Sequence, residues 1–252
     1  MHRLLVRTDL LEQESPVLPA DAARHLKVLR PEDGEEIELF DGKGRWRVYR
    51  FGRSGEDAAS PIRATSQTSQ ISQTSQTLTL FACVTKGSRW DWTIEKATEL
   101  GVTRIVPVIS DRTIVRIPKG ERAAKRERWM RIAEDAARQS DAKWLPEIAE
   151  AVDFKDVLPL VRETTCFIGA LVTPPARPLA EAVAEEVERR GVDVERNFSV
   201  FIGPEGDFTS DELGALMEIA IPTSFGPTIL RAETAAVYAV SVLSACGQIH
   251  RR

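Results

Sequence analysis

The chain is poor in the two residue types on which metal centres and many nucleophilic sites depend. Its 252 residues include three cysteines and three histidines. Cys83, Cys166 and Cys246 are far apart and odd in number, which speaks against a disulfide framework and a CxxC metal site and favours buried thiols. His2 and His250 lie near the chain ends. A zinc site or a Ser-His-Asp triad would therefore depend on His25 alone, and we expect no metal.

Long apolar runs are also missing. Apolar residues make up 42% of the chain, which is enough for a core, but no run approaches the length needed to cross a membrane. The N-terminal segment MHRLLVRTDLLEQE carries charges where a signal peptide has an apolar stretch. We therefore expect a cytoplasmic protein without a membrane segment, built as one large domain or two smaller ones.

The formal net charge of −4 argues against nucleic-acid binding when it is averaged over the whole chain. The charges are unevenly distributed, however. Residues 85–131 hold 12 Lys and Arg against 6 Asp and Glu, whereas residues 132–252 hold 11 against 20. Residues 41–53, DGKGRWRVYRFGR, hold five basic residues and one acidic residue. Because phosphate contacts depend on local basic patches, residues 85–131 and 41–53 are candidates for binding nucleic acid.

A polar repeat divides the chain. Residues 65–77, TSQTSQISQTSQT, carry no charge and almost no apolar side chains. Such a segment buries too little surface to offset the entropy of ordering, so we interpret it as a flexible linker, with a phosphorylated tract as the alternative. The repeat places a boundary near residue 70 and predicts one domain over residues 1–70 and a second over residues 71–252.

Before the repeat, the pattern is mostly that of β-strands. Three strands and one helix are predicted, over Leu4–Val6, Glu36–Phe40, Arg45–Phe51 and Asp21–Arg30 respectively. In the third strand, Arg45, Arg47 and Tyr49 share one face. A small barrel with a basic and aromatic face suits contacts with RNA backbone and bases, and a solvated strand face is the alternative.

After the repeat, strands and helices alternate. The predicted strands cover Leu78–Val84, Arg104–Ile109, Cys166–Leu171, Phe198–Ile202 and Ile221–Phe225. The predicted helices cover Ser88–Leu100, Glu121–Gln139, Phe154–Val161, Leu179–Arg190, the segment from Thr209 to Ala220, and Arg231–Ile249. Capping boxes are expected for Ser88 with Asp91 and for Thr209 with Glu212. The alternation predicts an α/β domain whose mainly parallel sheet is covered on both faces.

Two of these strands end at a Gly-Pro pair. Ser199–Gly206 reads SVFIGPEG, and Ser224–Ala235 reads SFGPTILRAETA. Glycine permits backbone angles closed to other residues and proline fixes φ, so both turns are tight and rigid. Ligands of open α/β sheets bind outside the carboxyl ends of the strands, so two such loops side by side would make a site lined largely by backbone. GPEG lacks the features of a Walker A or GxGxxG motif, which speaks against a nucleotide kinase or an NAD enzyme.

Three charged residues accompany these turns. Glu205 either caps its own loop or contacts a ligand. Glu233 lies in the first turn of the last predicted helix, where the helix dipole favours a carboxylate, so its position requires no function. Arg231 is a cation at a helix N-terminus, which is locally unfavourable, and we therefore interpret it as a functional residue with a partner.

Taken together, these segments resemble the RsmE family of 16S ribosomal RNA uridine-N3 methyltransferases, members of the SPOUT superfamily. FIGPEGDFTSDEL and FGPTILRAETA carry most of the resemblance. Residues 24–30, RHLKVLR, are similar to the family's HLxxVLR segment. Lys86-Gly87 and residues 95–102, EKATELGV, resemble its K…QKATELGV segment. Trp129 to Ile148 resembles its helix ending EQS…VPEI.

The resemblance implies a small N-terminal PUA-like β-barrel, a C-terminal SPOUT α/β domain with a trefoil knot, which is a rare feature, and a homodimer. S-adenosylmethionine would bind in the knot. The residues implied to line the cofactor site are Leu171, Gly203, Pro204, Glu205, Gly206, Gly226, Ile229 and Leu230. Arg231 and Glu233 would be the catalytic residues near the transferred methyl group.

The implied reaction is methylation of uridine N3 in 16S ribosomal RNA. Uracil N3 must lose a proton to become nucleophilic, so a cation near O2 or O4 would stabilise the anion. Arg231 is the candidate for this role or for clamping a phosphate, and Glu233 is the candidate base. The candidates for gripping RNA are Arg24, Arg30, Lys43, Arg45, Arg47, Lys86 and Arg89. Ribose 2′-O methylation by the same fold and a non-catalytic RNA-binding or ribosome-assembly role are the alternatives.

The chain departs from the family pattern at several positions. Asp207 replaces the second Gly of GPEGGF, and Phe225, Thr228 and Ala232 replace Leu, Arg and Thr in LGPRILRTETA. The Gln-Ser pair is followed by Asp141-Ala142-Lys143 instead of a continuation with Arg. The two lost arginines bear on RNA contacts rather than on cofactor binding.

Overall fold

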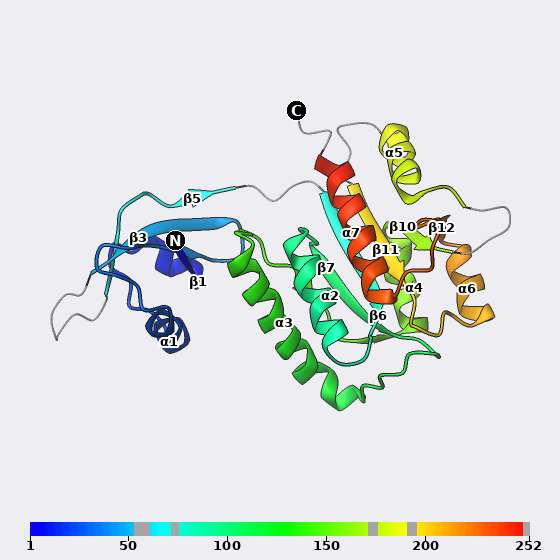
Figure 1. Cartoon of the computed structure of the whole chain (residues 1–252), viewed down its shortest axis with the longest axis horizontal. Coiled ribbons are helices and arrows are strands. Elements are labelled where there is room, and N and C mark those ends of the chain that lie inside the picture. The colour runs from blue at the N-terminus through cyan, green and yellow to red at the C-terminus, as the bar shows by residue number, and fades with distance from the viewer. Residues whose placement is uncertain (53–60, 72–75, 171–175, 191–195, 249–252) are drawn as a thin grey trace. The chain divides into compact units, whose positions relative to one another are not determined.

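The computed structural model describes residues 1–52, 61–71, 76–170, 176–190 and 196–248 (Figure 1). The chain forms two compact units, each described here by itself. Unit 1 comprises Met1–Gln73 and Ala137–Leu145, and unit 2 comprises Thr74–Ala136 and Pro146–Arg252. No sequence pattern set residues 137–145 apart from their neighbours, and their assignment to unit 1 is a finding of the structure.

Unit 1 is built around a five-stranded sheet in the order β1-β2-β3-β4, with β5 also paired to β3. β1 lies parallel to β2, and the other pairs are antiparallel. The strands are β1 (His2–Leu5), β2 (Glu36–Phe40), β3 (Arg45–Phe51), β4 (Ile62–Ala64) and β5 (Ser69–Gln70). Helix α1 (Ala20–Leu29) and a 3-10 turn over Thr8–Glu12 contribute Leu26, Leu10 and Leu11 to its apolar core.

Much of the polar repeat belongs to this sheet. Ser69–Gln70 form β5, and the N–H groups of Thr65 and Ile71 donate to the carbonyls of Val48 and Gly44, at 3.0 and 2.9 Å. Gln76 begins the first strand of unit 2, and residues 72–75 lie outside the described part of the chain. The interpretation of residues 65–77 as a flexible linker is therefore wrong for residues 65–71 and 76–77. Backbone hydrogen bonds to neighbouring strands order these residues although their side chains bury little apolar surface.

Unit 2 contains a seven-stranded sheet in the order β12-β10-β11-β6-β7-β8, with β9 also paired to β7. Every pairing described in this sheet is parallel, which confirms the predicted parallel α/β arrangement. The strands are β6 (Gln76–Cys83), β7 (Arg104–Ile109), β8 (Glu147–Ile148), β9 (Val152–Asp153), β10 (Thr165–Gly169), β11 (Arg196–Ile202) and β12 (Ala220–Thr223).

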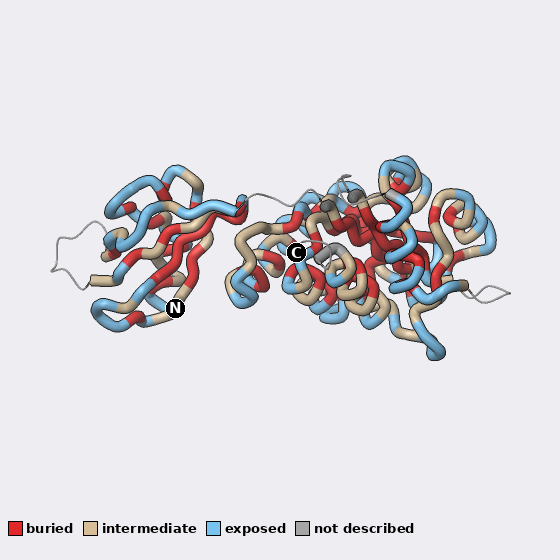
Figure 2. The backbone as a smooth tube through the Cα atoms, turned by 90° about the horizontal axis from the view of Figure 1, so that it is seen from above, coloured by how far each residue is buried: buried red, intermediate tan, exposed pale blue. Residues whose placement is uncertain are grey.

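Helices cover both faces of this sheet (Figure 1). They are α2 (Ser88–Glu99), α3 (Arg122–Gln139), α4 (Phe154–Arg162), α5 (Leu179–Arg190), α6 (Ser210–Met217) and α7 (Ala232–Gln248). Alternate residues of β6 point to opposite sides. Leu80 packs with residues of α2, α3, α5 and α7, whereas Phe81 packs with residues of α4 and α6. The strands are accordingly the most continuously buried segments (Figure 2). None of the described helices is long and apolar enough to span a bilayer.

One of the two predicted capping boxes forms. The hydroxyl of Thr209 accepts from the N–H of Glu212, and the carboxylate of Glu212 accepts from the N–H of Thr209, as predicted for α6. At α2 the prediction is wrong, because Gly87 with φ of +67° is the N-cap and Ser88 is already helical. The carboxylate of Asp91 instead accepts from Arg128 of α3, at 2.9 Å.

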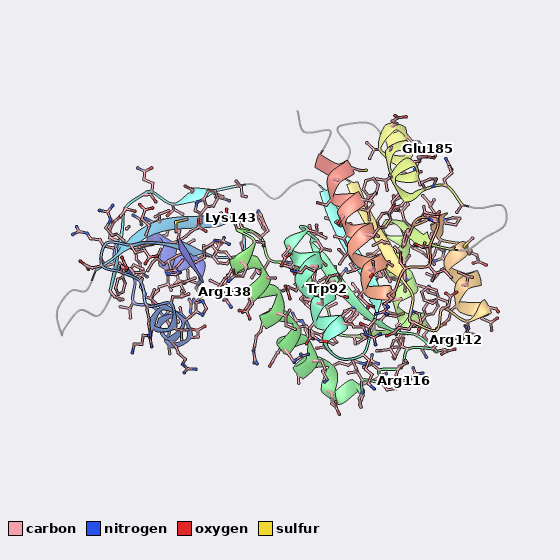
Figure 3. All side chains as sticks on the ribbon, viewed as in Figure 1. Trp92, Arg112, Arg116, Arg138, Lys143 and Glu185 are labelled. Atoms are coloured by element: carbon pink, nitrogen blue, oxygen red, sulfur yellow. The ribbon has the colours of Figure 1, made fainter. Side chains whose placement is uncertain are left out.

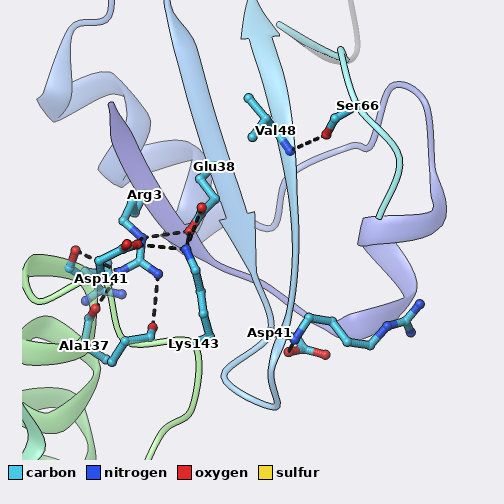
Figure 4. Close-up of polar contacts among 11 residues, drawn as sticks. Arg3, Glu38, Asp41, Val48, Ser66, Ala137, Asp141 and Lys143 are labelled. Atoms are coloured by element: carbon cyan, nitrogen blue, oxygen red, sulfur yellow. Dashed lines mark hydrogen bonds and ion pairs between the residues drawn. The ribbon is translucent and has the colours of Figure 1, made fainter. Parts of the chain in front are cut away.

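A buried charge network ties residues 137–143 to β1 and β2 within unit 1 (Figure 4). Arg3 Nε donates to Glu38 Oε1 at 2.8 Å, and Arg3 Nη1 donates to the carbonyl of Ala137 at 2.6 Å. Lys143 Nζ donates to both oxygens of Glu38 at 2.6 Å. Glu38 is buried, and its single negative charge is balanced by two cations, Arg3 and Lys143, since a buried carboxylate needs a partner.

Candidate active site

The loop after β11 carries GPEGDF, and its Phe208 side chain packs into a buried aromatic cluster. Pro204 and Phe208 are buried, and the ring of Phe208 lies 5.5 Å from that of Phe201 and 5.8 Å from that of Phe154. A Cβ atom at Gly203 would approach the Phe208 ring to 3.0 Å, so a glycine is favoured there. The loop therefore leaves the sheet with its buried side fixed by aromatic packing, while Glu205 and Gly206 are exposed.

Asp207 fits this loop although the family usually has glycine at this position. Its φ of +61° lies in the left-handed region, which aspartate tolerates better than most residues. Its N–H donates to the carbonyl of Pro204 at 3.0 Å, and its Oδ1 accepts from the N–H of Phe208 at 2.8 Å. These bonds keep the turn closed, so aspartate at this position is compatible with the turn.

Two arginines outside the loop hold it in place. Arg112 Nη1 donates to the carbonyls of Gly206 and Phe208 at 3.0 and 3.3 Å. Arg89, near the start of α2, pairs with Glu205 at 3.3 Å. Glu205 thus has a partner within the chain, and Arg89, expected to contact RNA, is at least partly engaged with the loop. Arg112 was missed in the sequence because nothing in its spacing links it to residues about 95 positions away.

Glu212 joins the same loop to the loop after β7. Besides completing the capping box of α6, its Oε1 accepts from the N–H of Asp111 at 2.9 Å. Arg116, in the same segment as Arg112 (Figure 3), donates to the carbonyls of Ser110 and Asp111 at 3.0 and 2.6 Å. The loops after β7 and β11 are therefore one hydrogen-bonded assembly at the carboxyl edge of the sheet.

The loop after β12 carries FGPTIL and is open to solvent. Gly226 has φ of +122°, which few other residues adopt, and Ile229 is 85% exposed although it is apolar. At the loop's start, Ser224 is tied by its backbone to residues 177 and 179, with N–H to O distances of 2.7 and 3.0 Å. A rigidly attached loop that exposes glycine, proline and isoleucine is suited to contact a ligand or a second protein surface.

The two Gly-Pro loops flank β10 rather than lying directly side by side as the sequence suggested. β10 pairs with β11 on one side and with β12 on the other. Neighbouring strands lie about 4.8 Å apart, so the ends of β11 and β12 are separated by about 10 Å. The end of β10 thus has a Gly-Pro loop on each side. Leu171, expected to line this site, lies outside the described residues.

Arg231 and Glu233 lie at the start of α7. Arg231 immediately precedes the helix and its carbonyl accepts from the N–H of Ala235 at 2.8 Å. Its side chain is exposed and makes no ion pair or hydrogen bond with any residue in the described part of the chain. Glu233 is half-buried, and its Oε2 is buried without a hydrogen-bond partner among the described residues. An orphaned carboxylate oxygen is costly, so its donor is to be sought beyond the described protein residues, in a ligand, a water molecule or the rest of the chain.

Two further buried polar atoms follow the same edge of the sheet. Thr85 Oγ1, just after β6, and Trp90 Nε1, in the first turn of α2, have no hydrogen-bond partner among the described residues. Helices α2 and α7 pack against each other, and both begin at this edge. The sequence singled out neither residue, because burial of a polar atom without a partner is visible only in three dimensions.

The structure separates the predicted RNA-binding residues into two groups. Arg24, Arg30, Lys43 and Lys86 have exposed side chains that form no ion pair with residues the structure describes. Arg47 is buried, and its guanidinium donates to the carbonyls of Ser66 at 2.7 Å and Leu11 at 3.2 Å and pairs with Glu14.

The predicted basic and aromatic face of β3 is therefore wrong. Tyr49, on the same side as Arg47, is fully buried and its hydroxyl lies within hydrogen-bond distance of the carbonyls of Leu10, Leu11 and Gln13. Arg45 pairs with Glu12. The face that the alternation marked as basic is the one that packs on the 3-10 turn, so Arg45 and Arg47 serve the fold of unit 1. Alternation predicts which residues share a face but not which face is covered.

In the part of the chain that the structure describes, the buried thiols and the carboxylates are not arranged to hold a metal. Among the described residues, no group of three or more His, Cys, Asp or Glu side chains is placed to hold an ion. Burial raises the pKa of the Cys83 thiol to about 11 and that of Cys166 to about 12. Both thiols are therefore protonated at neutral pH and are poor nucleophiles.

Comparison with known proteins agrees with this geometry. The family model described as "RNA methyltransferase domain" matches residues 72–244, and the model described as "RNA methyltransferase PUA domain" matches residues 18–59. The ribosomal RNA small subunit methyltransferase E of Synechocystis is 28% identical over 247 residues, covering 97% of this chain and 77% of that protein.

Two solved structures are similar along almost the whole chain. The ribosomal RNA small subunit methyltransferase E of Neisseria gonorrhoeae, bound to S-adenosyl methionine, has a TM-score of 0.78 at 25% identity and covers 97% of each chain. A putative methyltransferase of Legionella pneumophila, in complex with the same cofactor, has a TM-score of 0.77 at 26% identity and covers 96% of each chain. With residues 72–244 matched by the family model and the Gly-Pro loops at the carboxyl edge of a parallel sheet, the chain belongs to the RNA methyltransferase domain family.

Proposed function

We propose that this protein transfers a methyl group from S-adenosylmethionine to N3 of a uridine in 16S ribosomal RNA. The observation that carries the proposal is the pair of Gly-Pro loops flanking the end of β10, in a chain that belongs to an RNA methyltransferase family. Relatives named for methylation of small-subunit ribosomal RNA, one of them bound to the methyl donor, support the choice of substrate and donor.

We further propose the architecture that the resemblance implies. The predicted domain over residues 1–70, to which the structure adds Ala137–Leu145 in unit 1, would be a PUA-like barrel that binds RNA, and the rest of residues 71–252 would form a SPOUT domain with a trefoil knot. The protein would act as a homodimer in the cytoplasm. Ile229 of the FGPTIL loop, which is 85% exposed, would be available to a dimer interface.

The residues at the edge of the sheet fit a methyl donor. Gly203, Pro204 and Gly206 from one loop and Gly226, Ile229 and Leu230 from the other would contact it mainly through backbone, with Leu171 from the loop between them. Glu205 would act indirectly, since its carboxylate is paired with Arg89. The orphaned Glu233 Oε2 offers an acceptor to a donor group from a ligand. When bound, S-adenosylmethionine supplies an electrophilic methyl group on a sulfonium centre.

Catalysis would depend on alignment and on charge placed where the substrate becomes anionic. Arg231 has a guanidinium with no partner among the described residues, so it is free to stabilise the uracil anion at O2 or O4 or to hold a phosphate. Glu233, two residues further along, would accept the N3 proton. Exclusion of water by the surrounding loops would complete the alignment. No metal is required for any of these roles.

The RNA would be held by exposed cations. Arg24, Arg30 and Lys43 of unit 1 and Lys86 of unit 2 keep their charges available for phosphates. Arg89 would contribute once its pairing with Glu205 is exchanged for a phosphate, whereas Arg45 and Arg47 are not part of this proposal. Binding through such contacts weakens as salt concentration rises.

Isothermal titration calorimetry with S-adenosylmethionine tests the enzymatic proposal against the non-catalytic alternative. A methyltransferase of either kind binds the donor, with N3 or ribose 2′-O as the acceptor. A non-catalytic RNA-binding or ribosome-assembly factor does not require it. We expect saturable binding by the purified chain, and absence of binding would refute the enzymatic assignment.

A further inference from the structure

The ring of Phe225 lies directly on the glycine that ends β10. A Cβ atom built on Gly169 would stand 2.7 Å from Phe225 Cε2 and 2.9 Å from Cδ2. Side-chain carbon atoms pack at about 3.5–4.0 Å, so an alanine could not be accommodated without moving the ring. Gly169 does not have a positive φ. The glycine is therefore required by the neighbouring ring and not by its backbone conformation.

The other surroundings of Phe225 fix it in place. Its ring lies 5.7 Å from that of Tyr238 on α7, at an angle of 52°. It packs against the core cluster that includes residues of α5, α7 and the sheet. The residue before it, Ser224, donates to the carbonyl of Arg177 at 2.7 Å and accepts from the N–H of Leu179 at 3.0 Å. The start of the FGPTIL loop is thus fixed twice, by the backbone hydrogen bonds of Ser224 and by the packing of the Phe225 ring.

Gly169 and Phe225 also lie at the end of β10, the strand that separates the two Gly-Pro loops. Gly169 is paired with Thr223 of β12, and the N–H of the next residue, Ala170, donates to the carbonyl of Thr223 at 3.1 Å. β10 is the strand between the two Gly-Pro loops. A ring seated on its last residue therefore sets how close the FGPTIL loop comes to the end of β10.

We propose that Phe225 is a positioning residue for the methyl donor, with Gly169 as the residue that makes room for it. Seated on Gly169, the ring fixes the first turn of the FGPTIL loop and thereby the width of the donor site. This inference rests on the proposed function, because it concerns the same site.

The test is a double-substitution cycle on Gly169→Ala and Phe225→Leu, with the dissociation constant of S-adenosylmethionine measured by calorimetry. Gly169→Ala should weaken binding about tenfold, since the new methyl group displaces the ring and the loop. Phe225→Leu should have a smaller effect. In the double variant, Gly169→Ala should cost almost nothing further, because leucine leaves space for the methyl group, which amounts to about tenfold coupling between the two sites.

Gly214→Ala on α6 is the matched control, since a Cβ atom there meets nothing within 4 Å. It should leave donor affinity unchanged. Melting temperatures of all variants report whether each is folded, and rescue of a destabilised Gly169→Ala protein by Phe225→Leu would show the same coupling.

Two outcomes would overturn the inference in distinguishable ways. An equal loss of affinity from Gly169→Ala in both backgrounds would mean that the glycine does not serve the ring, while binding by the wild type would leave the proposed function intact. No binding by the wild type would refute the proposed function and the donor role of Phe225 with it.

Discussion

Arg231 and Glu233 are two residues apart in the chain, yet they meet opposite environments. The arginine is exposed and without a partner among the described residues, whereas the carboxylate has a buried oxygen without a donor. The sequence interpretation of Arg231 as a functional residue rested on its position at a helix N-terminus, and that position is what the structure shows. The isolation of Glu233 Oε2 adds an independent reason to place chemistry at the start of α7.

Replacing Arg231 with alanine should lower methyl transfer far more than donor binding. Loss of a group that stabilises a developing anion costs about 10²–10³-fold in turnover. The Kd for S-adenosylmethionine should remain close to the wild-type value, because this side chain faces the acceptor in the proposal. Single-turnover kinetics with small-subunit RNA, paired with calorimetry, separates the two quantities. Unchanged turnover would remove Arg231 from the catalytic site.

The buried thiols should be inert at the pH at which the enzyme is handled. Desolvation raises the pKa of Cys83 to about 11 and of Cys166 to about 12, so the thiolate is scarce at pH 8. Alkylation with iodoacetamide followed by mass spectrometry should leave both unmodified in the folded protein and modify both in denaturant. Because folding raises these pKa values, their contribution to stability is full below the ordinary thiol pKa of 9.0 and is lost as the pH rises toward 11–12. Rapid alkylation of the native protein would contradict this.

At the scale of the element, the GPEGDF loop takes its shape from residues that are remote in the chain. Arg112 holds two of its carbonyls and Glu212 links it to the loop after β7. The sequence motif identifies a turn and a ligand site but contains neither of these supports. The conformation of the GPEGDF loop therefore depends on residues that follow β7 as well as on residues that follow β11.

Removing the Arg112 side chain should loosen this loop and weaken donor binding about threefold to tenfold, the range expected for hydrogen bonds from a charged donor that is partly exposed. Arg116→Ala is the matched control, because the hydrogen bonds of Arg116 within the described ranges go to carbonyls of its own segment. Calorimetry on both variants measures the difference. Equal affinities for the two variants would show that the loop does not depend on Arg112.

The charge network of unit 1 also joins elements that are remote in the chain, namely β1, β2 and residues 137–143. Glu38 is buried between Arg3 and Lys143, whereas Asp141, which also pairs with both cations, is exposed. Hydrogen bonding from Lys143 lowers the pKa of Asp141. The residue that departs from the family pattern at position 141 therefore has a structural partner in this chain.

Glu38→Ala should destabilise the protein by about 3 kcal/mol, because two cations lose a buried counter-charge. Asp141→Asn keeps a side chain that tolerates φ of +58° and should cost less than about 1 kcal/mol, as exposed ion pairs contribute little. Urea unfolding followed by fluorescence compares the two. If Asp141→Asn lowered the free energy of unfolding as much as Glu38→Ala does, the contrast between a buried Glu38 and an exposed Asp141 would be contradicted.

At the scale of the whole molecule, the periodic elements could be predicted and the pairings between distant residues could not. Glu36–Phe40, Arg45–Phe51, Arg104–Ile109 and Leu179–Arg190 have the predicted bounds, because each is a run of consistent periodicity. The two-residue strands and the ordering of the polar repeat were missed, because a neighbouring strand, not local composition, determines them. The inward orientation of Arg47 was missed for the same reason.

The candidate site divides in the same way. The two Gly-Pro turns with Gly203 and Gly226, and Arg231, were predicted from turn chemistry and helix-end electrostatics, which are local. The position of β10 between the two loops, the clamp from Arg112 and the contact of Phe225 with Gly169 depend on strand order and on packing. The parallel sheet was predictable because alternation of strands and helices leaves few other arrangements, but the order of its strands was not.

The central claim is that this protein methylates uridine N3 of 16S ribosomal RNA, and nucleoside mass spectrometry tests it most directly. Small ribosomal subunits from cells that lack the gene would be incubated with the purified protein and isotopically labelled S-adenosylmethionine. We expect the label in N3-methyluridine of 16S RNA, and its loss with Arg231→Ala. Label in a ribose 2′-O-methyl nucleoside, or no label in 16S RNA, would contradict the account.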